Sequence, residues 1–276
     1  MRWNSLIGTM TRIALAQMTS GADFSRNLSV AEGLIPQAVR GGADLLAFPE
    51  VFLYLGPGAG KLAVAETLDG PTVGHFGAAA RKHRMMILLG SIHERSESET
   101  SRVYNTSVLI DRDGEIAAVY RKTRLFDVDL PGLRIKESES IIPGSEQPPV
   151  VSTDIGRVGL TICFDLRFPE IYRSLCARGA EIVFVPSNFT APTGEAHWSV
   201  LLRARAIENQ FYVAAPAQAG QHNPSYRSYG HALLVDPWGR VLLDAGEAPG
   251  VHISEADPEV VTRVRRELPM GSPAGP

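Results

Sequence analysis

The chain has 276 residues, 44% of them hydrophobic and 21% charged, and its 27 basic and 30 acidic side chains give a formal net charge of −3. This composition is typical of a globular protein and offers no basic face for nucleic acid. Two cysteines do not make a disulfide framework, and no apolar run approaches the roughly 18 residues of a membrane span, so we expect a cytoplasmic protein without membrane contact.

The first part of the chain alternates strand and helix patterns. We expect residues 1–10 to form a flexible leader and residues 12–17 the first strand. Helical spacing then predicts a helix over 25–40, with Ser25 or Asn27 near its start and Gly41-Gly42 after its end. The following patterns predict a strand over 43–48, a helix over 71–83, a strand over 85–90 and a hairpin over 106–120.

The second part repeats this order of elements. It is predicted to hold a strand over 158–162, a helix over 169–178, a strand over 181–185, a helix over 195–209, a strand over 211–215 and a hairpin over 229–244. The local sequences also match, since GADLLAFPE at 42–50 resembles GAEIVFVPS at 179–187. The alternative is that alternating strands and helices make any α/β protein self-similar.

From the repeat we predict two β-α-β-α-β-hairpin halves related by a pseudo-twofold axis. The fold class is then α/β, a four-layer αββα sandwich of two mixed sheets with helices on both outer faces. A single domain would span residues 11–268, followed by a flexible tail over 269–276. Residues 123–157 stand outside the repeat and are predicted to form a long, loop-rich connection, of the kind that is often functional.

Three reactive side chains follow predicted strands or hairpins. Glu50 ends an apolar strand, Lys122 follows the first hairpin, and Cys163 ends the first strand of the second half, where a sharp turn can expose a nucleophile. A carboxylate can take the thiol proton, and an ammonium can stabilise an oxyanion. Each residue alone has a plainer interpretation, namely a buried small cysteine, a loop carboxylate and one member of a solvated basic patch.

These residues lie in three motifs that resemble those of the nitrilase superfamily of carbon-nitrogen hydrolases. The motifs are Phe48-Pro49-Glu50, Tyr120-Arg121-Lys122, and the run CFDLRFPE that begins at Cys163. The resemblance extends from about residue 11 to about residue 268, and it implies a Glu-Lys-Cys triad, an αββα sandwich and a homodimer.

The resemblance also assigns further parts of the site. A second glutamate would fall on Glu137, which would hold Lys122 and help to manage the proton, and the oxyanion would rest on Lys122 and the backbone N–H of Phe164. The implied reaction passes through a thioester on Cys163 and needs no cofactor. No Gly-rich phosphate loop or metal-ligand spacing is present in the sequence, so neither a cofactor nor a metal is expected.

Within the superfamily, the second half is most similar to the branch that holds deaminated glutathione amidase and omega-amidase. We therefore expect a small-molecule amide substrate that carries a carboxylate. Arg167 is the candidate to bind that carboxylate, although it could instead form a salt bridge with Glu170 or Asp165. Phe189 and Thr193 are expected to line the pocket.

The sequence is also consistent with other functions. The chain could be a nitrilase or an N-carbamoyl amide hydrolase of the same superfamily. His197 or His231 could activate the cysteine in a Cys-His hydrolase, although a lone histidine is more often structural. A scaffold without activity would have lost a triad residue, and all three are present.

Overall fold

The computed structural model describes residues 10–130 and 133–270. The predicted leader at 1–10 and the predicted tail at 269–276 fall almost wholly outside these residues. The predictions about the two ends of the chain therefore stay predictions.

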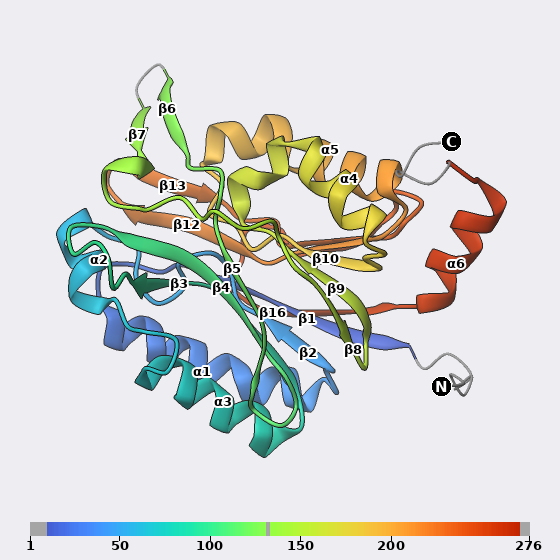
Figure 1. Cartoon of the computed structure of the whole chain (residues 1–276), viewed down its shortest axis with the longest axis horizontal. Helices are drawn as coiled ribbons and strands as arrows, with labels where there is room; N and C mark the ends of the chain where they lie inside the picture. Colours follow the sequence, from blue (N-terminus) through green and yellow to red (C-terminus); the bar gives the residue numbers. More distant parts are fainter. Residues whose placement is uncertain (1–9, 131–132, 271–276) are drawn as a thin grey trace.

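The first half of the chain forms most of one sheet. Three parallel strands, β1 (Thr11–Met18), β2 (Leu45–Ala47) and β3 (Met86–Arg95), are followed by the antiparallel strands β4 (Val103–Ile110) and β5 (Ile116–Arg121). Helices α1 (Phe24–Arg40) and α3 (Pro71–His83) cover the outer face (Figure 1). Ser25 and Asn27 lie in the first turn of α1, as predicted, and Asp23 caps the helix by accepting a hydrogen bond from the Arg26 N–H.

The second half repeats this topology in a second sheet. Three parallel strands, β9 (Gly156–Leu160), β10 (Ile182–Phe184) and β11 (Tyr212–Ala215), are followed by the antiparallel strands β14 (Leu233–Val235) and β15 (Val241–Asp244). Strand β8 (Val150–Thr153) adds to the edge of the sheet beside β9. Helices α4 (Pro169–Ala177) and α5 (Ala191–Asn209) cover its outer face (Figure 1).

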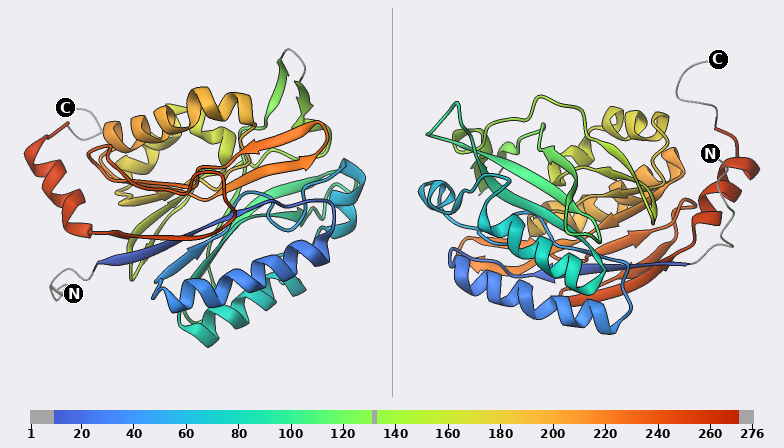
Figure 2. Two further views of the ribbon diagram at one scale, coloured as in Figure 1. Left: turned by 180° about the vertical axis from the view of Figure 1, so that it is seen from behind. Right: turned by 60° about the horizontal axis from the view of Figure 1, so that its bottom comes forward.

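The two sheets lie face to face between the helical layers (Figure 2). Side chains of β1 alternate between the two cores, because successive residues of a strand point to opposite faces. Ile13 and Leu15 pack in the cluster shared with the second sheet, whereas Ala14 and Ala16 pack with α1 and α3. The predicted four-layer sandwich with two matching halves is confirmed.

The connection over 123–157 is more ordered than expected. It holds a short hairpin of β6 (Asp127–Leu130) and β7 (Leu133–Lys136), then the 3-10 turn η1 (Glu137–Glu139) and strand β8. Helix α2 (Gly58–Val64) likewise forms in a Gly- and Pro-rich stretch that carries no helical pattern. Both segments lie beside the site described below.

Three strands of the second half complete the first sheet. Strands β12 (Ala217–Asn223) and β13 (Tyr226–Tyr229) form a hairpin, and β12 runs parallel to the end of β1. The hairpin predicted over 229–244 therefore begins only at Leu233, because Gly230 and His231 take positive φ values of 80° and 55° between the two sheets. Strand β16 (Gly250–Ala256) then pairs antiparallel with β1 and leads into α6 (Pro258–Glu267), at the end of the molecule where β1 begins (Figure 2).

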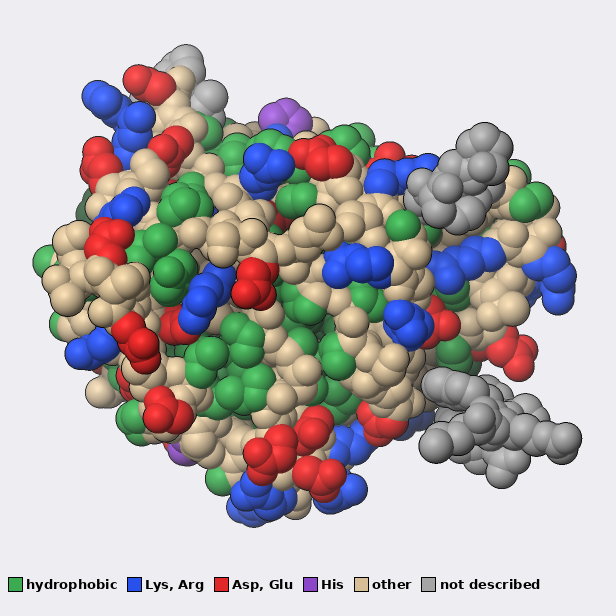
Figure 3. Space-filling model, in the orientation of Figure 1, with side chains coloured by type: hydrophobic (Ala, Val, Ile, Leu, Met, Phe, Trp, Pro, Cys, Tyr) green, Lys and Arg blue, Asp and Glu red, His purple; other side chains and the backbone are tan. Residues whose placement is uncertain are grey.

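The surface of the molecule carries mixed charge. On the face shown in Figure 3, acidic and basic side chains lie along the lower edge, and apolar side chains gather near the middle. Among the residues that the structure describes, no helix is long and apolar enough to cross a membrane.

Candidate active site

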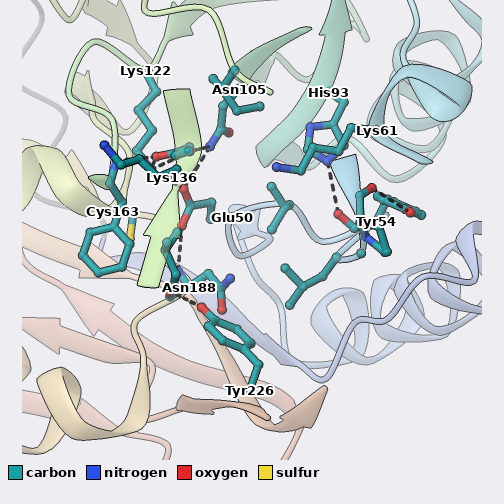
Figure 4. A pocket seen from close by; sticks show the side chains of 18 of the residues that line it. Glu50, Tyr54, Lys61, His93, Asn105, Lys122, Lys136, Cys163, Asn188 and Tyr226 are labelled. Atoms are coloured by element: carbon teal, nitrogen blue, oxygen red, sulfur yellow. Dashed lines mark hydrogen bonds and ion pairs between the residues drawn. The ribbon is translucent and has the colours of Figure 1, made fainter. Parts of the chain in front are cut away.

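A cavity of about 420 Å³ lies where several strands of both sheets end. Six of the residues that line it come from different segments of the chain: Glu50, Asn105, Lys122, Glu137, Cys163 and Asn188. In the close view of Figure 4, Glu50, Asn105, Lys122, Cys163 and Asn188 gather on one side. The four catalytic residues expected from the sequence are therefore brought together in one cavity.

Cys163 sits on a strained turn. Strand β9 ends at Leu160, and Cys163 begins the 3-10 turn η2 (Cys163–Arg167) with φ of +46°, a value that non-glycine residues rarely adopt. The buried Asp165 carboxylate holds this turn by accepting hydrogen bonds from the Ile162 N–H at 2.9 Å and the Tyr120 hydroxyl at 2.8 Å. The geometry is that of a nucleophile elbow, as the apolar strand followed by a polar run predicted.

Lys122 is clamped between two carboxylates. Its Nζ donates to Glu50 Oε1 at 2.8 Å and to Glu137 Oε2 at 2.9 Å, and only 2% of its side chain is exposed. The Glu137 carboxylate also accepts a hydrogen bond of 2.7 Å from the Phe126 N–H, which fixes it against the loop after β5. A buried ammonium is stable here because two anions face it.

The charges of the cluster shift the acidity of its members. Burial opposes the charge on Lys122, but the carboxylates of Glu137 and Glu50 outweigh burial and raise its pKa well above the ordinary value. Burial also acts against ionised Glu137, yet the Lys122 charge and the Phe126 N–H lower its pKa. For Cys163, burial and the Glu50 charge raise the pKa of the thiol, although Lys122 acts in the opposite direction. These influences favour the protonated thiol of Cys163 over the thiolate.

Two asparagines that the sequence analysis missed support this cluster. The Asn105 side chain donates to Glu50 Oε1 at 3.0 Å and to Glu137 Oε1 at 3.2 Å, which ties the two carboxylates together. The Asn188 N–H donates to Glu50 Oε2 at 2.9 Å. Glu50 ends the first copy of the repeated sequence, at 42–50, and Asn188 directly follows the second copy, at 179–187. Its nearness to Glu50 could therefore have been inferred from the repeat.

The residues expected to bind substrate line a second, smaller cavity of about 10 Å³. Phe164, Arg167, Phe189 and Thr193 border it, and Cys163 borders both cavities. Arg167 makes no ion pair with any residue in the described ranges, and its guanidinium lies over the rings of Phe164 and Phe189 at 5.8 and 5.3 Å from the centroids. Within the described part of the chain, Arg167 therefore does not form the alternative salt bridge with Glu170 or Asp165.

Both carboxylates considered as partners of Arg167 bind other groups. Glu170 pairs with Arg124 at 3.3 Å, and Asp165 holds the turn. Burial lowers the pKa of Arg167. A half-buried cation without a counter-ion would be stabilised by an anion in the smaller cavity.

The histidines considered for a Cys-His hydrolase lie away from the thiol. His197 Nδ1 is 3.3 Å from the Arg167 guanidinium, and His231 Nδ1 is 2.8 Å from Asp244 Oδ1. Neither histidine lines a cavity that contains Cys163. The arrangement therefore favours a carboxylate over a histidine as the base.

No group of three or more His, Cys, Asp or Glu side chains in the described part of the chain is placed to hold a metal ion. The cluster of Glu50, Lys122 and Glu137 is held by hydrogen bonds among its own members.

Comparison with known proteins gives a consistent result. A family model described as carbon-nitrogen hydrolase matches residues 12–266. The chain is 45% identical over 258 residues to the deaminated glutathione amidase of Synechocystis sp., with 93% of this chain and 95% of that relative covered.

Solved structures have the same fold. The NitFhit protein of Caenorhabditis elegans superposes with a TM-score of 0.88 at 40% identity over 94% of this chain, which spans 64% of that protein. A mutant amidase of Nesterenkonia sp. AN1, showing covalent addition of the acetamide moiety of fluoroacetamide at the active site cysteine, gives a TM-score of 0.80 at 27% identity, with 95% of each chain covered. The chain therefore belongs to the carbon-nitrogen hydrolase family, and it is an enzyme that hydrolyses the carbon–nitrogen bonds of amides.

Proposed function

We propose that the protein hydrolyses amides through a thioester on Cys163, with Glu50 and Lys122 as its catalytic partners and Glu137 in support. The observation that carries this proposal is the clamp of two carboxylates on Lys122 beside a buried cysteine at a strained turn. Because the pKa of the thiol is raised, a base must remove its proton as it attacks. Glu50 borders the same cavity, and it is the carboxylate whose charge acts on the thiol, so we assign it as that base.

In the first step the Cys163 sulfur bonds to the amide carbon while its proton passes to Glu50. The oxyanion rests on the Lys122 ammonium and the Phe164 N–H, since preformed donors stabilise charge as it develops. The carbon–nitrogen bond then breaks, the nitrogen takes the proton from Glu50, and ammonia or an amine leaves a thioester behind.

In the second step a water molecule gives a proton to Glu50 and its oxygen bonds to the thioester carbon. The carbon–sulfur bond breaks, the sulfur recovers the proton, and the acid is released. Glu137 keeps Lys122 charged and oriented throughout. A covalent adduct on the active site cysteine of the Nesterenkonia amidase supports the cysteine as nucleophile in this family.

We propose further that the acyl half of the substrate carries a carboxylate, which Arg167 binds beside Cys163. The unpaired, half-buried guanidinium supports this assignment, and so does the name of the Synechocystis relative, deaminated glutathione amidase. Deaminated glutathione is 2-oxoglutarate joined by an amide to cysteinylglycine, so its acyl half bears a 2-oxo carboxylate. An omega-amide such as α-ketoglutaramate has the same acyl half and releases ammonia.

The test is the release of 2-oxoglutarate from deaminated glutathione and from α-ketoglutaramate at neutral pH, with Cys163→Ala beside the wild type. Glutaramate and a simple nitrile complete the panel. We expect release from at least one 2-oxo amide by the wild type and none by the variant. Release that persists in Cys163→Ala would disprove the thioester mechanism. Silence of the wild type on every amide would disprove the substrate class.

We propose in addition that two copies pair as a homodimer in the cytoplasm. On α5 the apolar side chains of Val200 and Ile207 are 66% and 42% exposed, which supports a covered face there. Light scattering on the purified chain tests the dimer, and a monomer at micromolar concentration would contradict it.

A further inference from the structure

The substrate site has two compartments that meet at Cys163. The smaller one holds Arg167, and the cavity of about 420 Å³ holds Glu50, Lys122 and Glu137. Under the proposed mechanism Glu50 gives its proton to the leaving nitrogen, and Glu50 lines only the larger cavity. The amine half of the substrate must therefore occupy the larger cavity, which is far roomier than ammonia requires.

A second cation faces this larger cavity. Lys61 lies on α2 on the side of the cavity opposite Cys163, and its ammonium points into the cavity (Figure 4). The Nζ donates to Ser140 Oγ at 2.8 Å, and Lys61 forms no ion pair with any carboxylate of residues 10–130 and 133–270. Burial lowers the pKa of Lys61, and the more distant charge of Glu137 offsets this only in part. A ligand carboxylate would supply the counter-ion that the Lys61 ammonium lacks among the described residues.

A buried acceptor lies on the same side of the cavity. His93 is 5% exposed, and its Nε2 lies 3.2 Å from the Tyr54 carbonyl oxygen, so this nitrogen carries the proton. Burial and the Lys61 charge lower the pKa of His93 to about 3, so the ring is neutral at pH 7 and Nδ1 is an acceptor. Within the described part of the chain, Nδ1 has no hydrogen-bond partner, which is costly for a buried polar atom. A ligand N–H would satisfy it.

The charge of the larger cavity points to an anion. Three ammonium groups line it, those of Lys61, Lys122 and Lys136, against the two carboxylates of Glu50 and Glu137. Lys122 and the two glutamates that clamp it together carry one negative charge, and Lys136 balances that charge in the sum over the cavity. The positive charge of Lys61 is therefore available to a substrate.

We propose that Lys61 binds a carboxylate on the amine half of the substrate, and that His93 Nδ1 accepts a hydrogen bond from an N–H of the same half. The preferred substrate is then an N-substituted amide whose leaving amine is a short peptide with a free carboxylate. Arg167 and Lys61 would hold the two anionic ends on either side of Cys163. The inference rests on the proposed amidase function and adds the residue that selects the leaving group.

The experiment compares three substrates that yield the same product. Deaminated glutathione has a free carboxylate on its amine half, its N-methyl carboxamide derivative is neutral there, and α-ketoglutaramate has no amine half beyond ammonia. Release of 2-oxoglutarate is measured for the wild type, Lys61→Met and Lys82→Met. Lys82 is an exposed lysine on α3, so its variant controls for the loss of one positive charge.

We expect Lys61→Met to lower kcat/KM for deaminated glutathione about 10- to 150-fold, the range of one lost hydrogen bond to a charged group, with most of the change in KM. The loss on the other two substrates should be at least tenfold smaller, and Lys82→Met should match the wild type on all three. An equal loss on every substrate would overturn the inference and make Lys61 a general structural residue. A loss of less than twofold on deaminated glutathione would also overturn it.

Measurements on the wild type alone distinguish the role of Lys61 from the amidase function. Hydrolysis of α-ketoglutaramate without hydrolysis of deaminated glutathione would overturn the role of Lys61 and leave the proposed amidase function intact. Hydrolysis of none of the three would overturn both.

Discussion

The substitution Glu137→Gln tests the clamp on Lys122 most directly. Glu137 accepts four hydrogen bonds: from Lys122 on both oxygens, from Asn105 on Oε1 and from the Phe126 N–H on Oε2. Whichever way a glutamine is turned, its NH₂ group faces Lys122 and one further donor. A hydrogen bond to a charged group is worth about 1.5–3 kcal/mol. If it is lost from the transition state, kcat should fall about 10- to 150-fold.

Stability should fall as well, but by less than the about 3–5 kcal/mol that a fully unpaired buried charge costs, because Glu50 still faces Lys122. The assay is kcat for release of 2-oxoglutarate, together with urea unfolding of each protein. Glu139→Gln is the matched control, since Glu139 lies on the same 3-10 turn but is exposed, and it should change neither quantity. A Glu137→Gln enzyme with kcat within threefold of the wild type would refute the role of the clamp.

Two further predictions concern stability. Gly90→Ala would place a Cβ in a clash with the Phe48 carbonyl oxygen, close to Glu50. We expect this variant to lose about 3 kcal/mol or more of unfolding free energy in urea, and to lose activity as well. Gly74→Ala is the matched control on α3, where a Cβ meets nothing within 4 Å, and it should raise the unfolding free energy by about 0.5–1 kcal/mol. Because burial lowers the pKa of His93 from 6.5 to about 3, its contribution to stability is complete above pH 6.5 and is lost as pH falls towards 3. Between pH 7 and pH 4 the wild type should lose up to about 3 kcal/mol more unfolding free energy than His93→Gln, and equal losses would contradict the burial argument.

The main elements and the reactive residues could be predicted because each has a local signal. Helix α3 begins and ends at the predicted residues, where Pro71 opens it and an apolar stripe runs to His83. Glu50 and Cys163 each follow an apolar strand, and both residues line the same cavity.

Other parts of the site have no such signal. Asn105 is the third residue of β4 and begins a polar Asn-Thr-Ser run, which is equally consistent with an exposed position. Only the three-dimensional structure reveals its two carboxylate partners. Lys61 lies on a short helix in a Gly-Pro stretch. Strand β12 contains few β-branched residues, so its pairing with β1 depends on tertiary contacts rather than on local propensity.

The crossing of the chain at Pro216 couples the two sheets. Strand β11 ends at Ala215 in one sheet, and β12 begins at Ala217 in the other. Together with β16, which pairs with β1, this crossing makes the first sheet depend on segments that leave the ribosome late. Glu50 therefore reaches its final support only when the second half has folded. The enzyme should gain its activity in one cooperative event near the end of synthesis, and neither half should be active alone.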